Sequence, residues 1–423
     1  MPIIKDISKA KKKIQEITGR FDLSKRKKES KLVQNIIENV KASGDKALIY
    51  YTKKFDKVSL KILKIPANQI QNSTKSLGKT LLGAIKKAIK RINDFQKINV
   101  PKSWIKKTIA GEKLGYKYVP LDSVGIYIPG GKIPLISTVL MTVIPAKVAG
   151  VKRIAVFTPP PVHSGILSAC KLLGINEVYQ LGGAQAIAAA AFGTESIKPV
   201  DKIVGPGNIY VTLAKKNVFG KVGIDGLYGP SEIAIIADKN ANPQFLAMDL
   251  LSQLEHGSGL ESAFMVTNSE TLAKETQKKV FKLVKNLPNK KVVLKSWHKN
   301  SAIVVVRDLN KAIELINDLA PEHLEIIVQN PASIVSKIRN AGAVFLGEYS
   351  CESVGDYIAG PSHCLPTGGS ARFSSGLTVM DFMKKISMIS FDKKAFLKIS
   401  KDVAELADSE GLKAHGDAVR IRD

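Results

Sequence analysis

The chain has 423 residues, of which 44% are hydrophobic and 24% are charged. This balance is typical of a globular protein and excludes a disordered chain, and the length predicts more than one structural unit. The formal net charge of +27 would suggest a nucleic-acid partner. However, most of the 64 basic residues are lysines spread along the chain. Because nucleic-acid readers rely on arginine forks for bidentate contacts, we expect solvated lysine faces and no nucleic-acid partner.

Cysteine usage and the N-terminus both favour a cytoplasmic protein. Cys170, Cys351 and Cys364 form an odd set without a CxxC motif, which predicts a reducing compartment and no disulfide framework. The first residues lack an apolar run of signal-peptide length, and no stretch approaches the roughly 18 apolar residues of a membrane-spanning helix. We therefore expect no membrane partner.

The first third of the chain is predicted to be mainly helical. Residues 1–20 read as a short helical arm, and periodic apolar positions predict two helices within 28–56, interrupted around Gly44. A long helix is expected at 77–97.

Short apolar runs then alternate with helical patterns. Strands are expected at 124–128, 154–158, 177–181, 202–204 and 232–237, and helices at 135–149, 165–173, 184–192 and 208–218. A second series comprises a helix from Asn242-Pro243 to His256-Gly257, strands at 263–266, 301–306, 324–328 and 343–347, and helices at 270–286 and 309–319. Such alternation indicates parallel sheets flanked by helices.

These patterns predict an α/β fold with two Rossmann-like parallel-sheet domains and small helical N- and C-terminal segments. The first domain is expected to be discontinuous, formed by residues 21–123 and 231–377. The second covers residues 124–230. Residues 1–20 form the N-terminal arm, and residues 378–423 form the C-terminal helical segment.

Four pairs of polar residues are candidates for chemistry. Gln253 and His256 are three residues apart on a predicted helix, a spacing that places both on one face, although His256 could simply complement the helix dipole. An imidazole suits zinc, whereas an amide oxygen is an unusual ligand. Glu322 and His323 are adjacent at the start of a strand, so their side chains point in different directions. They could form a proton-handling pair, or they could simply be polar residues that begin the strand.

Two further pairs lie toward the C-terminus. Asp356 and His363 occupy a loop rich in glycine and proline, where an Asx-turn and a surface histidine are the plain alternative. Glu410 and His415 lie in the tail, where a solvated helix end explains them equally well.

Glycine-rich turns follow three strands of the first series, at 128–131, 181–185 and 204–208. Turns before helices present N–H groups to anionic ligands near the carboxyl ends of strands. The dinucleotide fingerprint GxGxxG is absent, so these turns could also be plain strand-to-helix connections.

Taken together, these stretches resemble the histidinol dehydrogenase family. The longest matching block is residues 224–257, from the GPSE turn to the QLEH pair. The other blocks occur in the family's order and are VGIYIPGG, STVLMTVIPAKVAGV, LGGAQAIAA, VGPGN, LAPEHLEI, GDYIAGPSHCLPTGG, ARFSSGL and EGLKAH. The resemblance covers most of residues 120–420.

The resemblance implies an NAD-dependent, zinc-containing alcohol and aldehyde dehydrogenase that oxidises L-histidinol to L-histidine through an aldehyde, within histidine biosynthesis. One zinc ion per subunit would be held by Gln253, His256, Asp356 and His415. The implied substrate-binding residues are Ser231, Gln253, His256, His323, Asp356, His363, Glu410 and His415. Those that contact NAD are Tyr127, Gln185 and Asn208. Glu322 and His323 take the acid–base roles.

The resemblance also implies a homodimer with shared sites, in which Glu410 and His415 reach the partner's site. One departure is visible, because Leu227-Tyr228 stands where the family usually has a proline–alanine pair. Two rival functions differ in class. A zinc hydrolase would also use a glutamate and a histidine near a metal, but would not need the glycine turns. A basic nucleic-acid binder rests on the charge alone.

Overall fold

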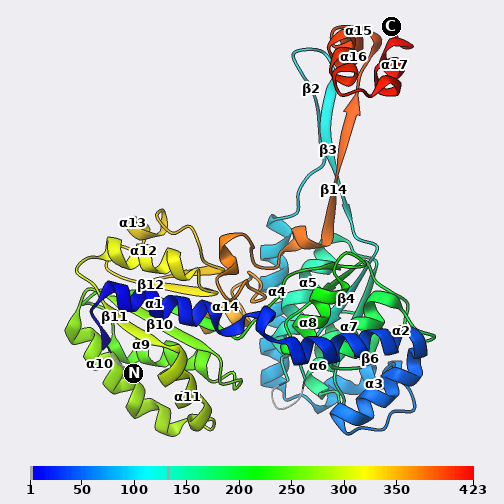
Figure 1. Cartoon of the computed structure of the whole chain (residues 1–423). Coiled ribbons are helices and arrows are strands. Elements are labelled where there is room, and N and C mark those ends of the chain that lie inside the picture. Colours follow the sequence, from blue (N-terminus) through cyan, green and yellow to red (C-terminus); the bar gives the residue numbers. More distant parts are fainter. Residues whose placement is uncertain (1–2, 131–133) are drawn as a thin grey trace.

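The computed structural model describes residues 3–130 and 134–423 and contains two parallel sheets, each with helices on both faces (Figure 1). The expected α/β class, with two parallel-sheet units and helical segments at both ends, is confirmed. Cys170, Cys351 and Cys364 are free thiols. Across the described parts of the chain, no helix is long and apolar enough to cross a membrane.

The first unit is built on a six-stranded sheet. Its order is β1 (Ile3–Ile4), β11 (Ala302–Val305), β10 (Ser262–Thr267), β9 (Glu232–Ala237), β12 (His323–Ile327) and β13 (Ala343–Leu346), with every pair parallel. One face packs on α1 (Ile7–Thr18) and α12 (Leu309–Leu319), and the other on α9 (Pro243–Leu254), α10 (Glu270–Leu283) and α11 (Lys290–Asn300). Because both faces are covered, the central strand β9 is buried at every residue.

The second unit is built on a five-stranded parallel sheet. Its order is β6 (Val178–Gln180), β5 (Arg153–Thr158), β4 (Ser123–Tyr127), β7 (Lys202–Val204) and β8 (Gly223–Ile224). One face packs on α2 (Lys27–Asp56), α7 (Gly183–Phe192) and α8 (Ile209–Val218). The other face packs on α3 (Ala67–Asn72), α4 (Lys79–Ile98), α5 (Ile136–Ala149) and α6 (Ser164–Leu172).

Helices α2 and α4 pack on the five-stranded sheet, which differs from the expected domain boundaries. Val33 of α2 shares a core with Ala186, and Ile92 of α4 shares another with Val139. Residues 21–123 were expected to belong to the same domain as residues 231–377 instead. Apolar periodicity identifies the buried face of a helix, but it does not identify the sheet that covers that face. The two helices expected within 28–56 form α2, with non-helical backbone at Gly44.

A three-stranded antiparallel sheet projects from the five-stranded unit as an arm (Figure 1). It pairs β14 (Met383–Ser390) with β3 (Lys113–Pro120), and β3 with β2 (Trp104–Lys107). At its far end it carries α15 (Lys393–Leu397), α16 (Ser400–Ser409) and α17 (Lys413–Arg420). The tail is therefore helical only after a strand that the sequence analysis did not predict.

Candidate active site

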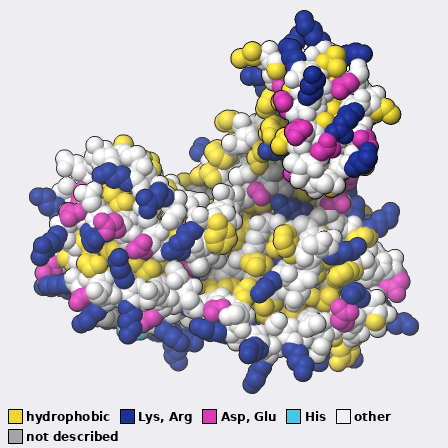
Figure 2. Space-filling view, turned by 45° about the horizontal axis from the view of Figure 1, so that its top comes forward, with side chains coloured by type: hydrophobic (Ala, Val, Ile, Leu, Met, Phe, Trp, Pro, Cys, Tyr) yellow, Lys and Arg dark blue, Asp and Glu magenta, His cyan; other side chains and the backbone are white. Residues whose placement is uncertain are grey.

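A cavity of about 420 Å³ lies between the two units, where Figure 2 shows the surface hollowed. It brings together most of the predicted site residues, namely Ser231, Gln253, His256, Glu322, His323, Asp356 and His363. The five-stranded unit contributes Thr138, Asn208 and Tyr228 to the lining. The cavity faces the amino ends of the six-stranded sheet, because His323 is the first residue of β12 and Ser231 immediately precedes β9.

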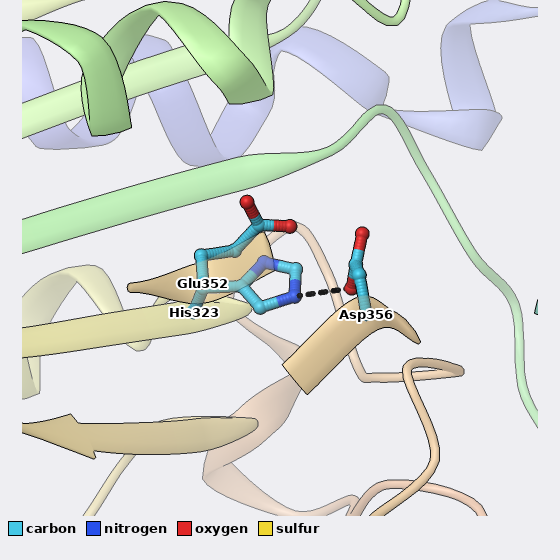
Figure 3. A group of neighbouring side chains, drawn as sticks. All are labelled: His323, Glu352 and Asp356. Atoms are coloured by element: carbon cyan, nitrogen blue, oxygen red, sulfur yellow. Dashed lines mark ion pairs between the residues drawn. The ribbon is translucent and has the colours of Figure 1, made fainter. Parts of the chain in front are cut away.

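The main chain of Glu232 fixes the tautomer of His323. The Nδ1 atom of His323 lies 3.0 Å from the carbonyl oxygen of Glu232, which can only accept, so Nδ1 carries the proton. The Nε2 atom is buried without a hydrogen-bond partner and lies 3.6 Å from Oδ1 of Asp356 (Figure 3). When His323 is neutral, its lone pair is therefore on Nε2, the nitrogen nearer Asp356.

The side chain of Glu322 binds the main-chain N–H of Glu232, the residue whose carbonyl oxygen binds His323. Its Oε2 atom accepts the main-chain N–H of Glu232 at 2.8 Å. Burial raises the pKa of Glu322 to about 8. Burial alone would lower the pKa of His323, but the carboxylates of Glu322 and Asp356 outweigh it and raise that pKa to about 10. Two groups able to exchange protons therefore line one wall of the cavity.

His363 links the two units at the opposite side of Asp356. Its Nδ1 atom donates to the main-chain oxygen of Asp356 at 3.0 Å, which leaves Nε2 to accept from the Thr138 hydroxyl at 3.1 Å. Burial lowers the pKa of His363, so its ring is neutral near pH 7. Burial opposes ionisation of Asp356, but His323 and His363 outweigh it and lower the pKa of its carboxyl.

Gln253 and His256 are close, but not as two residues of one helix. Helix α9 ends at Leu254, so His256 lies beyond it, exposed, with Nδ1 3.1 Å from the carbonyl oxygen of Gln253. The expectation that the helix continues to His256 is wrong, because the helical backbone stops at Glu255 and Gly257 adopts a positive φ of 88°. Both side chains still line the cavity.

The side-chain amide of Gln253 is an orphan. Both its oxygen and its nitrogen are buried, and neither has a hydrogen-bond partner among the described residues. A buried amide left unpaired costs free energy, which a ligand in the cavity would recover. The lining therefore offers an amide oxygen, an imidazole and the ionised Asp356 together, and this donor set fits a zinc ion.

A second arrangement of possible metal ligands overlaps the first at Asp356. Donor atoms of His323, Glu352 and Asp356 lie within 4.8 Å of one another (Figure 3). Glu352 belongs to α14 (Glu352–Tyr357), one turn before Asp356, and burial raises its pKa to about 8. A carboxyl that is hard to ionise is a weaker ligand than Asp356, and His323 would lose its free lone pair if it bound a metal.

A separate cavity of about 540 Å³ lies at the carboxyl ends of the five-stranded sheet and is lined by Tyr127, Gln185 and Asn208. The Tyr127 hydroxyl accepts the N–H of Gly183 at 3.1 Å, so its own proton is free to donate. Burial raises the pKa of Tyr127 to about 12, which keeps it protonated. The wall of this cavity is largely apolar and carries a few amide and hydroxyl groups, which fits a dinucleotide cofactor.

Gly205 sets the position of Asn208 at this cavity. Its φ is 112°, and a Cβ atom there would lie 2.1 Å from the carbonyl oxygen of Tyr127. Only glycine permits this approach of the turn to β4. Asn208 then caps α8 through Oδ1, which leaves its side-chain N–H groups for a ligand. Gly131, the last residue of another predicted turn, lies outside the described residues.

Glu410 and His415 do not join this cavity within one chain. Both are exposed, and α17, which contains His415, lies at the far end of the arm (Figure 1). In the single chain, three of the four expected zinc ligands line one cavity, and the fourth lies on the arm.

Several site residues were not identified from the sequence. Arg20, between α1 and α2, forms a buried ion pair with Glu232 at 2.7 Å and donates to the main-chain oxygens of Pro230 and Leu260. It thereby holds the turn before β9. Glu352 could have been found from its spacing of four residues from Asp356 on a short helix, whereas Arg20 carries no local signal.

Tyr228, the visible departure from the family pattern, is buried and lines the cavity between the two units. The ammonium of Lys215 lies 4.7 Å from the centre of its ring, and Lys215 is itself ion-paired with Asp225. The ring is thus held by a buried cation, which accounts for how the bulky side chain is accommodated.

Comparison with known proteins decides the family. The histidinol dehydrogenase family model matches residues 20–423. The chain belongs to the histidinol dehydrogenase family. It is 45% identical over 422 residues to histidinol dehydrogenase of Bacillus licheniformis, covering 97% of this chain and 99% of that protein. It is 46% identical to the Bacillus subtilis enzyme, with the same coverage.

A crystal structure of histidinol dehydrogenase from Elizabethkingia anophelis has the same fold, with a TM-score of 0.90 and 40% identity, covering 93% of this chain and 91% of that one. Membership in the histidinol dehydrogenase family makes the protein an oxidoreductase and argues against the hydrolase alternative. The suspected family is therefore confirmed.

Proposed function

We propose that the protein oxidises L-histidinol to L-histidine through L-histidinal, using two molecules of NAD and one zinc ion per active site. The observation that supports this most directly is the meeting of Glu322, His323 and Asp356 in one cavity of a chain that belongs to this family. The apolar cavity that contains Tyr127 and Gln185 shares Pro129 and Asn208 with this one, so a cofactor and a substrate could meet at that shared wall.

In the first step, the alcohol loses a proton from oxygen and a hydride from carbon, and the aldehyde forms. In the neutral form of His323 the Nε2 lone pair is free and the ring is held through Nδ1 by Glu232, so Nε2 is the base for the proton. The raised pKa of His323 means that the ring must first lose a proton, which favours activity at alkaline pH. Neutral His363 and Thr138 position the substrate on the opposite side. The nicotinamide ring, when bound, supplies the hydride acceptor.

In the second step, water adds to the aldehyde, and the hydrate loses a proton and a second hydride to give the carboxylic acid. Glu322 is suited to activate the water, because a carboxyl with a pKa near 8 is, once ionised, a stronger base than an ordinary carboxylate. Its Oε2 atom is fixed by the Glu232 N–H, which aims the carboxylate. Burial excludes competing solvent from both steps.

For zinc we propose Gln253, His256 and Asp356 of one chain, with His415 of a second copy. When bound, zinc would supply a Lewis acid that orients the substrate. The orphaned amide of Gln253 supports this set over the one that contains Glu352. Ser231 and, from the second copy, Glu410 complete the proposed substrate contacts.

The proposed homodimer follows from the arm. Its end carries exposed apolar side chains, including Ile389, Leu406 and Leu412, which a second copy would cover. The same end carries His415, which the single chain leaves far from the cavity. We also propose that the protein is cytoplasmic.

The test is to incubate purified, zinc-loaded protein with L-histidinol and NAD. Near-ultraviolet absorbance of NADH should rise by two equivalents for each L-histidine formed. No NADH from a metal-replete dimer would refute the substrate assignment.

Zinc content measured by elemental analysis tests the ligand set. His415→Ala should lower the bound zinc, whereas Glu352→Gln, which keeps the side-chain shape, should leave it unchanged. The reverse pattern would favour the His323, Glu352 and Asp356 arrangement.

A further inference from the structure

Asp56 is a carboxylate in the cavity lined by Tyr127 and Gln185, and neither the fold nor the proposed reaction uses it. It is the last residue of α2 and lines the cavity beside Phe55. Its Oδ2 atom is buried and has no hydrogen-bond partner among the described residues. Asp56 takes part in none of the ion pairs of the described residues.

The position of Asp56 is unfavourable for stability. A carboxylate at the C-terminal end of a helix faces the negative end of the helix dipole. Burial raises the pKa of Asp56, and its charge also helps to raise the pKa of Tyr127 across the cavity. An unpaired acid that is disfavoured by both burial and the dipole is a candidate for binding a ligand.

The wall shared by the two cavities indicates which way a dinucleotide would lie in the cavity that contains Asp56. Pro129 and Asn208 line both, so this end lies toward the reacting carbon of the substrate and would hold the nicotinamide. Asp56 lies with Leu32 and Ile36, which come from α2 and do not line the substrate cavity. The α2 end would therefore hold the adenosine half of a dinucleotide.

The lining also lacks positive charge. In a chain with 64 basic residues, none of the described residues around this cavity is lysine or arginine. A site for a 2′-phosphorylated cofactor needs such a cation, whereas a site for NAD uses an acid that accepts from the ribose hydroxyls.

We propose that Asp56 is the cofactor-selecting residue, accepting hydrogen bonds from the adenosine ribose hydroxyls and repelling a phosphate at the 2′ position. The inference rests on the proposed NAD-dependent function and deepens it. An ionised carboxylate only accepts, so a vicinal diol can donate to both its oxygens. A phosphate there would place roughly two further negative charges beside it, without a neutralising partner.

The test compares NADH and NADPH binding by fluorescence titration, using wild-type protein, Asp56→Asn and the control Glu38→Gln. Glu38 is an exposed acid on the same helix, paired with Lys41 and outside the cavity lining. Wild type and Glu38→Gln should bind NADH at least about tenfold more tightly than NADPH, and Asp56→Asn should narrow this ratio by about tenfold.

ADP-ribose and its 2′-phosphate, titrated as competitors, restrict the measurement to the adenosine half and should follow the same ratios. The melting temperature of Asp56→Asn should not fall, because the carboxylate has no partner to lose. If that variant does not fold, Asp56→Ser replaces it.

An unchanged ratio in the Asp56 variant, or equal binding of both cofactors by wild type, overturns the inference while leaving the dehydrogenase proposal intact. If NADH and NADPH both fail to bind the wild type, the NAD-dependent function fails with it.

Discussion

His323 donates from Nδ1 to the carbonyl oxygen of Glu232, while the adjacent Glu322 accepts the N–H of that same residue. One residue at the start of β9 thus orients both proposed proton carriers at the start of β12. The two strands are neighbours in the sheet, so the hydrogen bonds between β9 and β12 hold these residues in fixed positions. His323 is held on a strand, and Glu322 immediately precedes that strand.

Removing the imidazole should therefore affect chemistry without affecting the metal. His323→Asn should lower kcat for L-histidinol oxidation by about 10²- to 10⁴-fold, the usual range for a general base. Zinc content should be unchanged, since His323 is outside the proposed ligand set. A loss of zinc that parallels the loss of activity would mean that His323 binds the metal.

Glu322→Gln should separate the two halves of the reaction. The amide oxygen of glutamine can still accept the Glu232 N–H, so the fold should persist, but the base for water is lost. Oxidation of L-histidinal should fall by about 100-fold, and oxidation of L-histidinol by much less. Equal losses, measured from alcohol and from aldehyde in separate assays, would contradict the division of roles.

The Arg20–Glu232 pair should be important for stability, because its side chains are only 5% and 3% exposed. Arg20→Gln leaves a buried carboxylate unpaired, which should destabilise the protein by about 3–5 kcal/mol in chemical denaturation. The control is Lys5→Gln, which removes an exposed pair with Glu270 and should leave the unfolding midpoint unchanged. Similar shifts in the two variants would show that burial of the Arg20 pair has no special effect.

Mixing two inactive variants tests the shared site. His323→Asn and His415→Ala change residues that belong to the same site but to different chains of the proposed dimer. After subunit exchange at equal amounts, half of the dimers are mixed, and each has one intact site. Activity should recover to roughly a quarter of wild type. No recovery after verified exchange would place both residues in one chain's site.

Much of the fold was predictable from local patterns. Strand β9 was expected at 232–237 and lies at Glu232–Ala237, because a fully buried strand is continuously apolar and is bounded by turn residues. The start of α9 followed from Asn242, whose side chain accepts the N–H of Gln244. These signals are contained within a few residues.

The arm could not be predicted in this way. The strand Met383–Ser390 pairs with Lys113–Pro120, which is far away in sequence, and most residues of β14 are exposed. Strands in solvent on both faces lack the apolar alternation that sequence reasoning detects. The resemblance to the family implied that His415 is a zinc ligand, but its place far from the cavity in a single chain was visible only in the structure.

The arm has a kinetic consequence for the cell. If a finished site needs the end of a neighbouring arm, then a newly made chain is inert until it encounters another, and the yield of working enzyme rises with the square of chain concentration while chains are scarce. Expression level would then set specific activity as well as total activity.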